Sequence, residues 1–474
     1  MGTPLRLTEV FESLPAAWPA TDLRGEIRAQ VEASGTKIVV LDDDPTGTQT
    51  VHDVPVLTSW DISVLATELR SGQSLFYILT NSRALSQNDA VALARALGTN
   101  LSRAIRQTGC RLSVISRSDS TLRGHYPAET DALAEALDLA PDGILIVPYF
   151  QEGGRFTIND VHYVREGQCL VPAAETEFAR DPVFGYRQSN LRQWVEEKTG
   201  GRWRAEQVLS LPLPVIRQGG SEQVAALLVQ ATSGQPVVVN AACDRDLEVV
   251  VKGLLQAEAA GKHFLCRTAA SFVKVRGGIS DQGLLAPAEL LTGQSRCAGG
   301  LVVVGSHVPR STRQLQALLA LEAWYGIEVD VASLLTPTTR RVHLNDVSRQ
   351  LAAALASGRH VALFTSRTLV TGQSKAESLD IGQSVSLALV ELVERLHEQP
   401  RFLIAKGGIT SSDIATRALG VRRAIVMGQV APGVPVWRLG SESRFPGLAY
   451  VIFPGNVGDD NTLAQVAAKL AAAG

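Results

Sequence analysis

The sequence predicts an α/β protein of two domains, each with a mainly parallel sheet flanked by helices, and with a cleft between the domains. Short apolar runs alternate with helical stretches, which is the pattern of a parallel sheet. The chain has 474 residues, of which 45% are hydrophobic and 19% charged, so it can build large cores. A stretch rich in Gly, Ser and Ala at 276–300 separates two such alternating runs and marks the expected boundary.

The first domain is expected at residues 37–290, after an N-terminal extension at 1–36 that contains a helix and to which we assign no chemistry. Residues 151–235 are less regular and form an insert. Apolar β-branched runs predict strands, and longer amphipathic runs predict helices. The expected strands lie at 37–41, 75–79, 111–115, 143–147 and 236–240. The expected helices lie at 24–33, 62–70, 89–106, 130–139, 191–197 and 246–260.

The second domain is expected at residues 298–474, where the same alternation resumes. No internal repeat relates it to the first domain. The expected strands lie at 301–304, 361–365, 401–405, 424–427 and 450–453. The expected helices lie at 311–321, 384–398, 413–419 and 462–473.

Composition limits the classes of function. The net charge of −2 gives no basic excess and argues against nucleic acid as the main partner. The five cysteines are far apart without a CxxC spacing, which argues against a zinc site or a disulfide framework. No apolar run of about eighteen residues predicts a membrane span, and no signal pattern opens the chain. These features predict a soluble cytoplasmic protein. They leave the oligomeric state open, a homodimer included.

Three adjacent carboxylates, Asp42, Asp43 and Asp44, follow the strand expected at 37–41. Ligands bind outside the carboxyl ends of such strands, and three aspartates together need solvent, a cation or donor groups. One alternative is an acidic turn that caps the next helix. Another is the DxDxT nucleophile loop of haloacid-dehalogenase-like phosphatases, which Asp42-x-Asp44-x-Thr46 fits.

A second polar loop follows the strand expected at 111–115. It contains Arg117, Asp119, Ser120, Arg123, Gly124 and His125. Guanidinium groups bind carboxylate or phosphate through a planar fork of donors, and Arg83 follows another expected strand end. These residues suit a small anionic, hydroxylated ligand. The alternative is a structural network of ion pairs among Arg117, Arg123 and Asp119, and His125 alone is a weak signal.

Glycine loops follow the strands of the second half. Lys406-Gly407-Gly408 leads into a helix, where free N–H groups and the helix dipole favour a phosphate. Gly305-Ser306 repeats this arrangement more weakly. The alternative is an ordinary glycine turn. Asp459 and Asp460 could hold Mg²⁺, although a solvated turn explains them better. No Walker-type P-loop, protein-kinase motif set or GxSxG elbow is present.

Together these motifs resemble the four-carbon acid sugar kinase family from about residue 37 onward. Residues 43–47 match its DD-x-TG loop, and residues 117–124 match its K-x-DSTLRG stretch with Arg in place of Lys. Residues 305–306 match its GS loop, and residues 407–411 match its GGETS loop. Residues 432–435 and 454–458 match its PGVP and SGN-x-G loops. Ile409 departs from the family, because it replaces the acidic residue of GGETS.

The resemblance implies an ATP-dependent kinase of carbohydrate catabolism. It would phosphorylate a hydroxyl of a small sugar acid such as threonate, erythronate or 3-oxo-tetronate. The first domain would bind the acid, and the second would bind ATP with Mg²⁺, whose protein ligands we leave unassigned. A non-catalytic sugar-acid sensor, suggested by Ile409, and the phosphatase are the alternatives.

Site residues carried over from the resemblance fall into three sets. The expected catalytic base is Asp44 or Asp119. The expected acid-binding residues are Asp43, Arg83, Arg117, Ser120, Arg123, Gly124 and His125. The expected nucleotide-binding residues are Ser306, Gly407, Gly408, Ile409, Thr410, Gly455 and Asn456.

Overall fold

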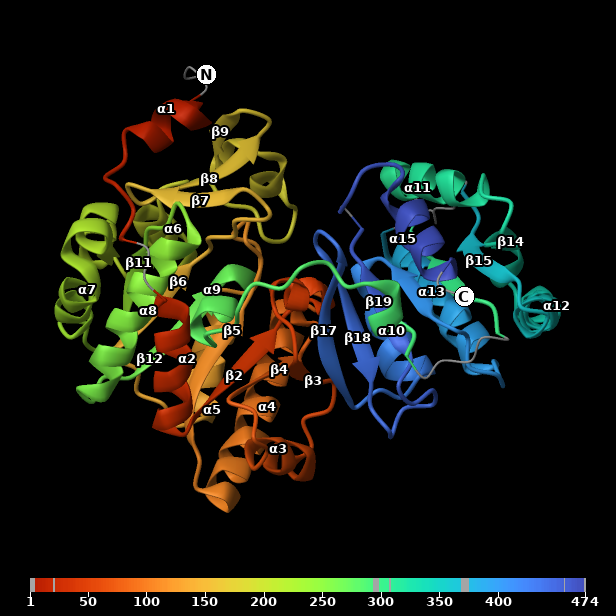
Figure 1. The fold of residues 1–474 in the computed structure, drawn as a ribbon, viewed down its shortest axis with the longest axis horizontal. Helices are drawn as coiled ribbons and strands as arrows, with labels where there is room; N and C mark the ends of the chain where they lie inside the picture. Colours follow the sequence, from red (N-terminus) through yellow and green to blue (C-terminus); the bar gives the residue numbers. More distant parts are fainter. Residues whose placement is uncertain are drawn as a thin grey trace. The chain divides into compact units, whose positions relative to one another are not determined.

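The chain folds into two compact units, each built of helices around a mainly parallel sheet (Figure 1). The computed structural model describes residues 5–19, 22–292, 298–306, 308–367, 375–455 and 457–472. The first unit comprises residues 1–47 and 59–281, and the second comprises residues 48–58 and 282–474. The two α/β domains expected from the sequence are therefore present. Residues 48–58, however, belong to the second unit, whereas the expected first domain ran without interruption from 37 to 290.

A parallel sheet forms the centre of the first unit, with the strand order β10-β11-β6-β12-β5-β2-β4. Its strands are β2 (Thr36–Asp42), β4 (Leu75–Leu79), β5 (Arg111–Arg117), β6 (Gly143–Val147), β10 (Leu209–Leu211), β11 (Gln235–Val239) and β12 (Phe264–Thr268). Ile38, Val39 and Val40 of strand β2 are fully buried. Such near-continuous apolar runs are expected when helices cover both faces of a parallel sheet.

Helices flank this sheet in two groups. In one group α3 packs on α4 and α4 on α5, and in the other α8 contacts α2, α7 and α9. Their bounds, with those of two helices outside the groups, are α1 (Leu7–Glu12), α2 (Leu23–Ser34), α3 (Ile62–Leu69), α4 (Gln87–Thr108), α5 (Ala128–Ala136), α6 (Leu191–Lys198), α7 (Gly220–Leu228), α8 (Asp244–Ala259) and α9 (Ala270–Arg276). Local signals set the limits of α4, because Ser86 accepts a hydrogen bond from the N–H of Asp89 and Gly109 ends the helix at φ 71°.

Three strands of the insert and one strand of the N-terminal extension form a separate 4-stranded antiparallel sheet with the order β1-β9-β8-β7. Its strands are β1 (Leu5–Arg6), β7 (Arg155–Ile158), β8 (Val161–Glu166) and β9 (Cys169–Pro172). A bridge between Thr157 and Ala241 ties β7 to the segment that follows β11. The sequence predicted no sheet here, because these strands are short and lack a clear alternation of apolar and polar residues.

A mixed sheet forms the centre of the second unit, with the order β3-β17-β18-β19-β16-β13-β15-β14. Strands β19, β16, β13, β15 and β14 pair in parallel, whereas β3, β17, β18 and β19 pair antiparallel. The strands are β3 (Val54–Leu57), β13 (Leu301–Val304), β14 (Trp324–Val329), β15 (His360–Thr365), β16 (Leu403–Lys406), β17 (Arg423–Ala431), β18 (Val434–Leu439) and β19 (Ala449–Phe453). β14 and β18 were not predicted.

Residues 48–58 join the second unit through backbone pairing and side-chain contacts. β3 pairs antiparallel with β17, and the N–H of Asp53 donates to the carbonyl of Val426 at 2.7 Å. The indole N–H of Trp437 donates to Thr48 Oγ1 at 3.1 Å. An apolar core that includes Val302, Phe402 and other buried residues lies under this sheet.

The helices of the second unit differ in detail from those expected. The helix expected at 413–419 begins earlier, with α14 at Gly408, and the one expected at 384–398 is part of the longer α13. α12 was not predicted. The bounds are α10 (Pro287–Leu290), α11 (Pro309–Leu319), α12 (Pro337–Ala356), α13 (Lys375–Glu394), α14 (Gly408–Asp413) and α15 (Thr462–Ala471). Among the described residues, no helix has the length and apolarity that a membrane crossing requires.

Candidate functional site

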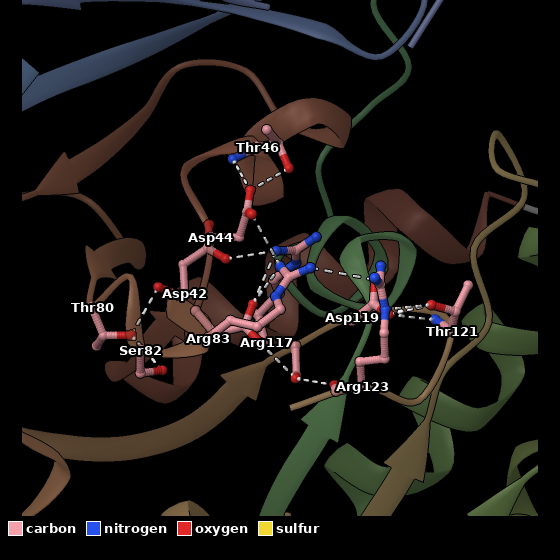
Figure 2. Close-up of polar contacts among 12 residues, drawn as sticks. Asp42, Asp44, Thr46, Thr80, Ser82, Arg83, Arg117, Asp119, Thr121 and Arg123 are labelled. Atoms are coloured by element: carbon pink, nitrogen blue, oxygen red, sulfur yellow. Dashed lines mark hydrogen bonds and ion pairs between the residues drawn. The ribbon is translucent and has the colours of Figure 1, made fainter. Parts of the chain in front are cut away.

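The carboxyl ends of β2, β4 and β5 bring the predicted polar residues of the first unit together. β2 lies between β4 and β5, and Asp42 is in register with Leu79 on one side and Arg117 on the other. The loops that leave these three strands therefore start side by side at one edge of the sheet. Figure 2 shows the aspartates and arginines of these loops turned toward one another.

Asp42 and Arg117 form a buried ion pair within this group of aspartates and arginines. Arg117 Nη1 lies 2.9 Å from Asp42 Oδ1, and the two residues are 5% and 1% exposed. Asp42 Oδ2 is buried without a hydrogen-bond partner. Burial raises the pKa of Asp42 to about 7, with Asp43 and Asp44 acting in the same direction and Arg117 against them. A Cβ at Gly47 would lie 2.2 Å from this carboxylate, so a residue larger than glycine at position 47 would clash with it.

Asp43 is held by donors from three directions. Arg83 Nη2 lies 2.9 Å from its Oδ1, and Ser118 Oγ donates to its Oδ2 at 2.8 Å. Arg117 Nη1 is 3.5 Å from Oδ1. Because both oxygens already accept hydrogen bonds and the residue is buried, Asp43 fixes the two arginines in place.

Asp44 is the most open of the three aspartates. Its side chain is 24% exposed, and Oδ2 lies 3.4 Å from Arg83 Nη2. Thr46 donates to Oδ1 through its N–H at 2.8 Å and its hydroxyl at 2.5 Å. Burial alone would raise the pKa of Asp44, but Arg83, Arg117 and Thr46 together hold it below its usual value. Asp44 is therefore a carboxylate that remains ionised and faces outward.

Asp119 is tied to its own loop. Its Oδ2 accepts from Arg123 Nε at 2.8 Å and from the hydroxyl and N–H of Thr121, while Arg83 Nη1 lies 3.4 Å from Oδ1. Burial opposes ionisation, yet Arg83 and Arg123 hold the pKa of Asp119 far below its usual range. The side chain of Arg123 is 26% exposed and lies over the ring of Phe178, with its Cζ 5.3 Å from the centroid.

Gly124 and His125 stabilise the loop that follows β5 through close packing and hydrogen bonds. Gly124 has φ 120°, and a Cβ there would lie 2.6 Å from Ser118 Oγ. His125 is buried, and its Nε2 lies 3.2 and 3.1 Å from the carbonyl oxygens of Ser82 and Leu85. Because carbonyls only accept, this nitrogen carries the proton and holds the turn that bears Arg83.

Several polar residues of this region were missed from the sequence. His162 Nε2 lies 2.7 Å from the carbonyl of Ser120, and burial lowers the pKa of this histidine to about 4. Arg267, fully buried on β12, donates to the carbonyl of Arg123 at 2.9 Å. Ser82 donates to Glu129 at 2.5 Å. His162 and Arg267 are lone polar residues in otherwise apolar or irregular segments, so only their positions in space reveal them.

In the second unit, three parallel strands, β13, β16 and β19, end at the predicted glycine loops. Val304 is in register with Lys406 and Phe364, and Lys406 with Phe453. The segments that begin at Gly305, Gly407 and Pro454 therefore leave one edge of the sheet next to one another, each from its own strand. In parallel sheets, the ends of the strands and the starts of the helices that follow them are where phosphates commonly bind.

Close packing fixes two of these loops against each other. A Cβ at Gly305 would lie 2.7 Å from Thr410 Oγ1, and Gly407 has φ 108°, which favours glycine. The hydroxyl of Ser411 donates to the carbonyls of Gly407 and Gly408 at 2.8 and 2.9 Å. The side chain of Thr410 thus lies directly beside the Gly305-Ser306 turn.

Lys406 and Arg367 donate hydrogen bonds to backbone carbonyls of these loops. Lys406 Nζ donates to the carbonyls of Pro454 and Gly455 at 3.1 and 3.4 Å and lies 4.5 Å from the centre of the Phe453 ring. Burial lowers the pKa of Lys406 to about 7. Arg367 Nη1 donates to the carbonyl of Ser306 at 2.7 Å. Both residues fasten loop backbone.

The remaining predicted positions have varied outcomes. Ile409 is 60% exposed, so the residue that departs from the family motif faces outward. Asp459 accepts from Thr462 and Asn461 in the turn before α15, and Asp460 lies 2.9 Å from Arg313. These contacts agree with a structural turn. Asn456 lies outside the described residues. Within the described ranges, no three His, Cys, Asp or Glu side chains are grouped so as to hold a metal ion.

Two family models cover most of the chain. A model described as a sugar-binding N-terminal domain matches residues 38–276, and one described as a nucleotide-binding C-terminal domain matches residues 301–463. The chain belongs to the four-carbon acid sugar kinase family. This confirms the family to which the sequence motifs pointed. The Asp–Arg cluster lies within the sugar-binding match; it consists of Asp42, Asp43, Asp44, Asp119, Arg83, Arg117 and Arg123.

Named relatives of this four-carbon acid sugar kinase family member are distant. It is 27% identical over 67% of its length to a D-erythronate kinase of Heliobacterium modesticaldum, and the alignment spans 64% of that relative. It is 28% identical over 76% of its length to a 3-oxo-tetronate kinase of Methylobacterium radiotolerans, over 81% of that relative. A crystal structure of a Haemophilus influenzae protein has the same fold, with a TM-score of 0.62 and 19% identity over 91% of this chain and 99% of that one.

Asp42→Asn should flatten the pH dependence of stability in this family member. Burial raises the pKa of Asp42 to about 7, so the folded chain binds this proton more tightly than the unfolded chain does. The stability that the proton contributes is fully present below about pH 4, the unfolded pKa, and is lost as the pH rises through about 7. Because asparagine does not titrate, the urea midpoint of the variant should fall less than that of the wild type between about pH 5 and pH 8.

Asp138→Asn is the matched control, because Asp138 is exposed after helix α5. Its urea midpoint should follow that of the wild type at every pH. Identical pH slopes for Asp42→Asn and the wild type would contradict the account of a buried, proton-binding Asp42.

Proposed function

We propose that this chain is an ATP-dependent kinase that phosphorylates a hydroxyl of a small four-carbon sugar acid such as erythronate, threonate or 3-oxo-tetronate. One observation carries the proposal: a sugar-binding match that contains the Asp–Arg cluster and a nucleotide-binding match that contains the strand-end glycine loops occur in one chain. The names of the relatives support the substrate class. Phosphoryl transfer then requires mainly positioning and neutralisation of charge.

Within the acid site, the arginines have different roles. Arg117 is buried against Asp42 and Asp43, and Arg83 is within ion-pair distance of Asp43, Asp44 and Asp119. We propose that these two arginines hold the aspartates in place. Arg123 has a more exposed side chain and uses only its Nε to donate to Asp119. Its remaining N–H groups would bind the carboxylate of the acid.

Asp44 is the better candidate for the catalytic base. Asp119 has a strongly lowered pKa, and both of its oxygens already accept hydrogen bonds from arginines. It is therefore a poor acceptor for the proton of a substrate hydroxyl. The side chain of Asp44 is more exposed, at 24% against 12% for Asp119. Its lowered pKa is no obstacle, because the substrate hydroxyl loses its proton late in a loose phosphoryl-transfer transition state. Asp44 would orient the hydroxyl and accept this proton.

The nucleotide would bind at the carboxyl ends of β13, β16 and β19. Backbone N–H groups of the turns at Ser306 and Gly408 would bind phosphate oxygens, with Gly407, Thr410 and Gly455 lining the same edge. The N–H of Gly407 itself donates to the carbonyl of Phe453 at 2.8 Å. Mg²⁺ usually keeps several waters and binds substrate phosphates, so we propose that it enters with ATP. We assign nucleotide binding to residues 298–474 and acid binding to residues 37–290, and the cleft between them stays a prediction.

The two alternative functions fare differently. A phosphatase would need Asp42 as an accessible nucleophile, but Asp42 is 1% exposed and paired with Arg117. A sugar-acid sensor would keep the acid site without turnover. It remains open because Ile409 places an apolar, exposed side chain in the glycine loop.

A coupled assay for ADP tests the proposed kinase. With MgATP, the purified chain should form ADP in the presence of at least one acid among threonate, erythronate and their 3-oxo forms, because the chain carries both a sugar-binding and a nucleotide-binding match. Asp44→Asn should lower kcat by about 100- to 10,000-fold, the range for loss of a positioned acid or base, with little change in KM for the acid.

Asp61→Asn provides the control, since Asp61 precedes helix α3 and lies outside the cluster. It should leave kcat unchanged. Binding of an acid without ADP formation would favour the sensor, and full activity in Asp44→Asn would remove Asp44 as the base.

Gly305→Ala should weaken nucleotide binding selectively. The added Cβ would lie 2.7 Å from Thr410 Oγ1, so the two loops that line the proposed phosphate site must move apart. We expect KM for ATP to rise by about tenfold, equivalent to about 1.4 kcal/mol, while KM for the acid stays the same. Initial-rate kinetics with each substrate varied in turn measure both constants.

Gly382→Ala is a suitable control, because the space around a Cβ at Gly382 in α13 is open. It should change neither constant. An equal rise in both KM values for Gly305→Ala would point to a general loss of fold instead.

A further inference from the structure

Arg155 stands out because it is a guanidinium in the sugar-binding part without a carboxylate partner. It opens strand β7 of the insert sheet. Its Nη1 donates to the carbonyl of Gly153, and its Nε is buried without a hydrogen-bond partner. Among the described residues, no Asp or Glu oxygen lies within ion-pair distance of Arg155. By contrast, Arg83, Arg117 and Arg123 each have such partners.

Phe178 brings Arg155 and Arg123 together. The Cζ of Arg155 lies 5.6 Å from the centre of the Phe178 ring, and the Cζ of Arg123 lies 5.3 Å from it. The two guanidinium groups thus share one aromatic ring. Burial lowers the pKa of Arg155, the charge of Asp119 acts in the opposite direction, and the charge of Arg123 has a smaller lowering effect.

The buried Nε of Arg155 has no hydrogen-bond acceptor in this arrangement. A half-buried N–H group without an acceptor costs free energy. The carboxylates around Arg123 are already paired with it: Asp119 is bound to its Nε, and Asp181 is 3.7 Å from its Nη1. A bound carboxylate could accept hydrogen bonds from both guanidinium groups and satisfy them together.

We propose that Arg155 binds the carboxylate of the substrate acid together with Arg123. The two form a clamp that makes the site select an acid over the corresponding neutral polyol. This inference rests on the proposed function and deepens it, because it names a specificity residue in the insert.

The insert holds Arg155 at this position by backbone contacts. Arg155 is in register with Val164 of β8, and the next residues of β7 reach the bridge between Thr157 and Ala241. Phe156, its neighbour on β7, is buried. The insert sheet therefore has a function: it carries one cation to the loop that contains Arg123.

Arg155→Met and Arg155→Lys test the clamp by calorimetric titration with erythronate or threonate, whichever the wild type binds. Removing a charge-assisted hydrogen bond should weaken binding of the acid by about 10- to 100-fold in Arg155→Met. Arg155→Lys should be intermediate, because a lysine keeps the charge but not the planar fork. Binding of a neutral polyol such as threitol or erythritol should change by less than about twofold. In kinetics, KM for the acid should rise while kcat is kept.

Arg165→Met is the matched control, because Arg165 lies on the adjacent strand β8 and is exposed. It should bind the acid as the wild type does. The clamp is overturned if both Arg155 variants bind the acid within about twofold of the wild type, or if the polyol weakens as much as the acid does. Should Arg155→Met fail to fold, as judged by circular dichroism, Arg155→Lys alone decides between these outcomes.

The proposed function and the clamp fail in different ways. A wild-type chain that forms ADP with an acid, together with unchanged Arg155 variants, overturns the clamp alone. A wild-type chain that neither binds nor phosphorylates any of the acids overturns both.

Discussion

The buried ion pair between Asp42 and Arg117 is the contact on which the acid site depends. The sheet places these residues in register on adjacent strands, and each is almost inaccessible to water. Removing one partner of such a pair leaves an uncompensated buried charge, a cost of about 3–5 kcal/mol. Asp43 then fixes Arg83 and Arg117, and Arg83 reaches Asp44 and Asp119. The orientation of the outward carboxylate Asp44 follows from this chain of contacts.

The same principle operates in both units, with different chemistry. In each, parallel strands in register deliver several loops to one edge of a sheet. In the first unit the loops carry charges that neutralise one another and leave few groups open. In the second unit they carry glycines and backbone N–H groups, and the buried Lys406 and Arg367 hold carbonyls of the loops. The first arrangement suits an anionic, hydroxylated ligand, and the second suits phosphate.

Sequence reasoning predicted the features that depend on local pattern. The strand at 37–41, the helix at 62–70 and the polar loops at strand ends are all present, because apolar runs and turn residues determine them locally. It missed the insert sheet, whose strands are short and lack a clear alternation of apolar and polar residues. It also missed the position of residues 48–58, which depends on pairing with the distant strand β17. It also assigned Arg117 to the substrate, because a sequence does not show that Asp42 already neutralises this residue. Arg155 and Arg267 gave no local signal at all.

The central claim is that the aspartates already occupy Arg83 and Arg117, so that the acid is bound by the guanidinium groups that remain open. A crystal structure of the chain with a four-carbon sugar acid bound tests this most directly. We expect the carboxylate of the acid within hydrogen-bonding distance of Arg123 and Arg155, a hydroxyl beside Asp44, and the Asp42–Arg117 pair intact. A carboxylate that displaces Asp42 from Arg117, or that binds away from this cluster, would contradict the account.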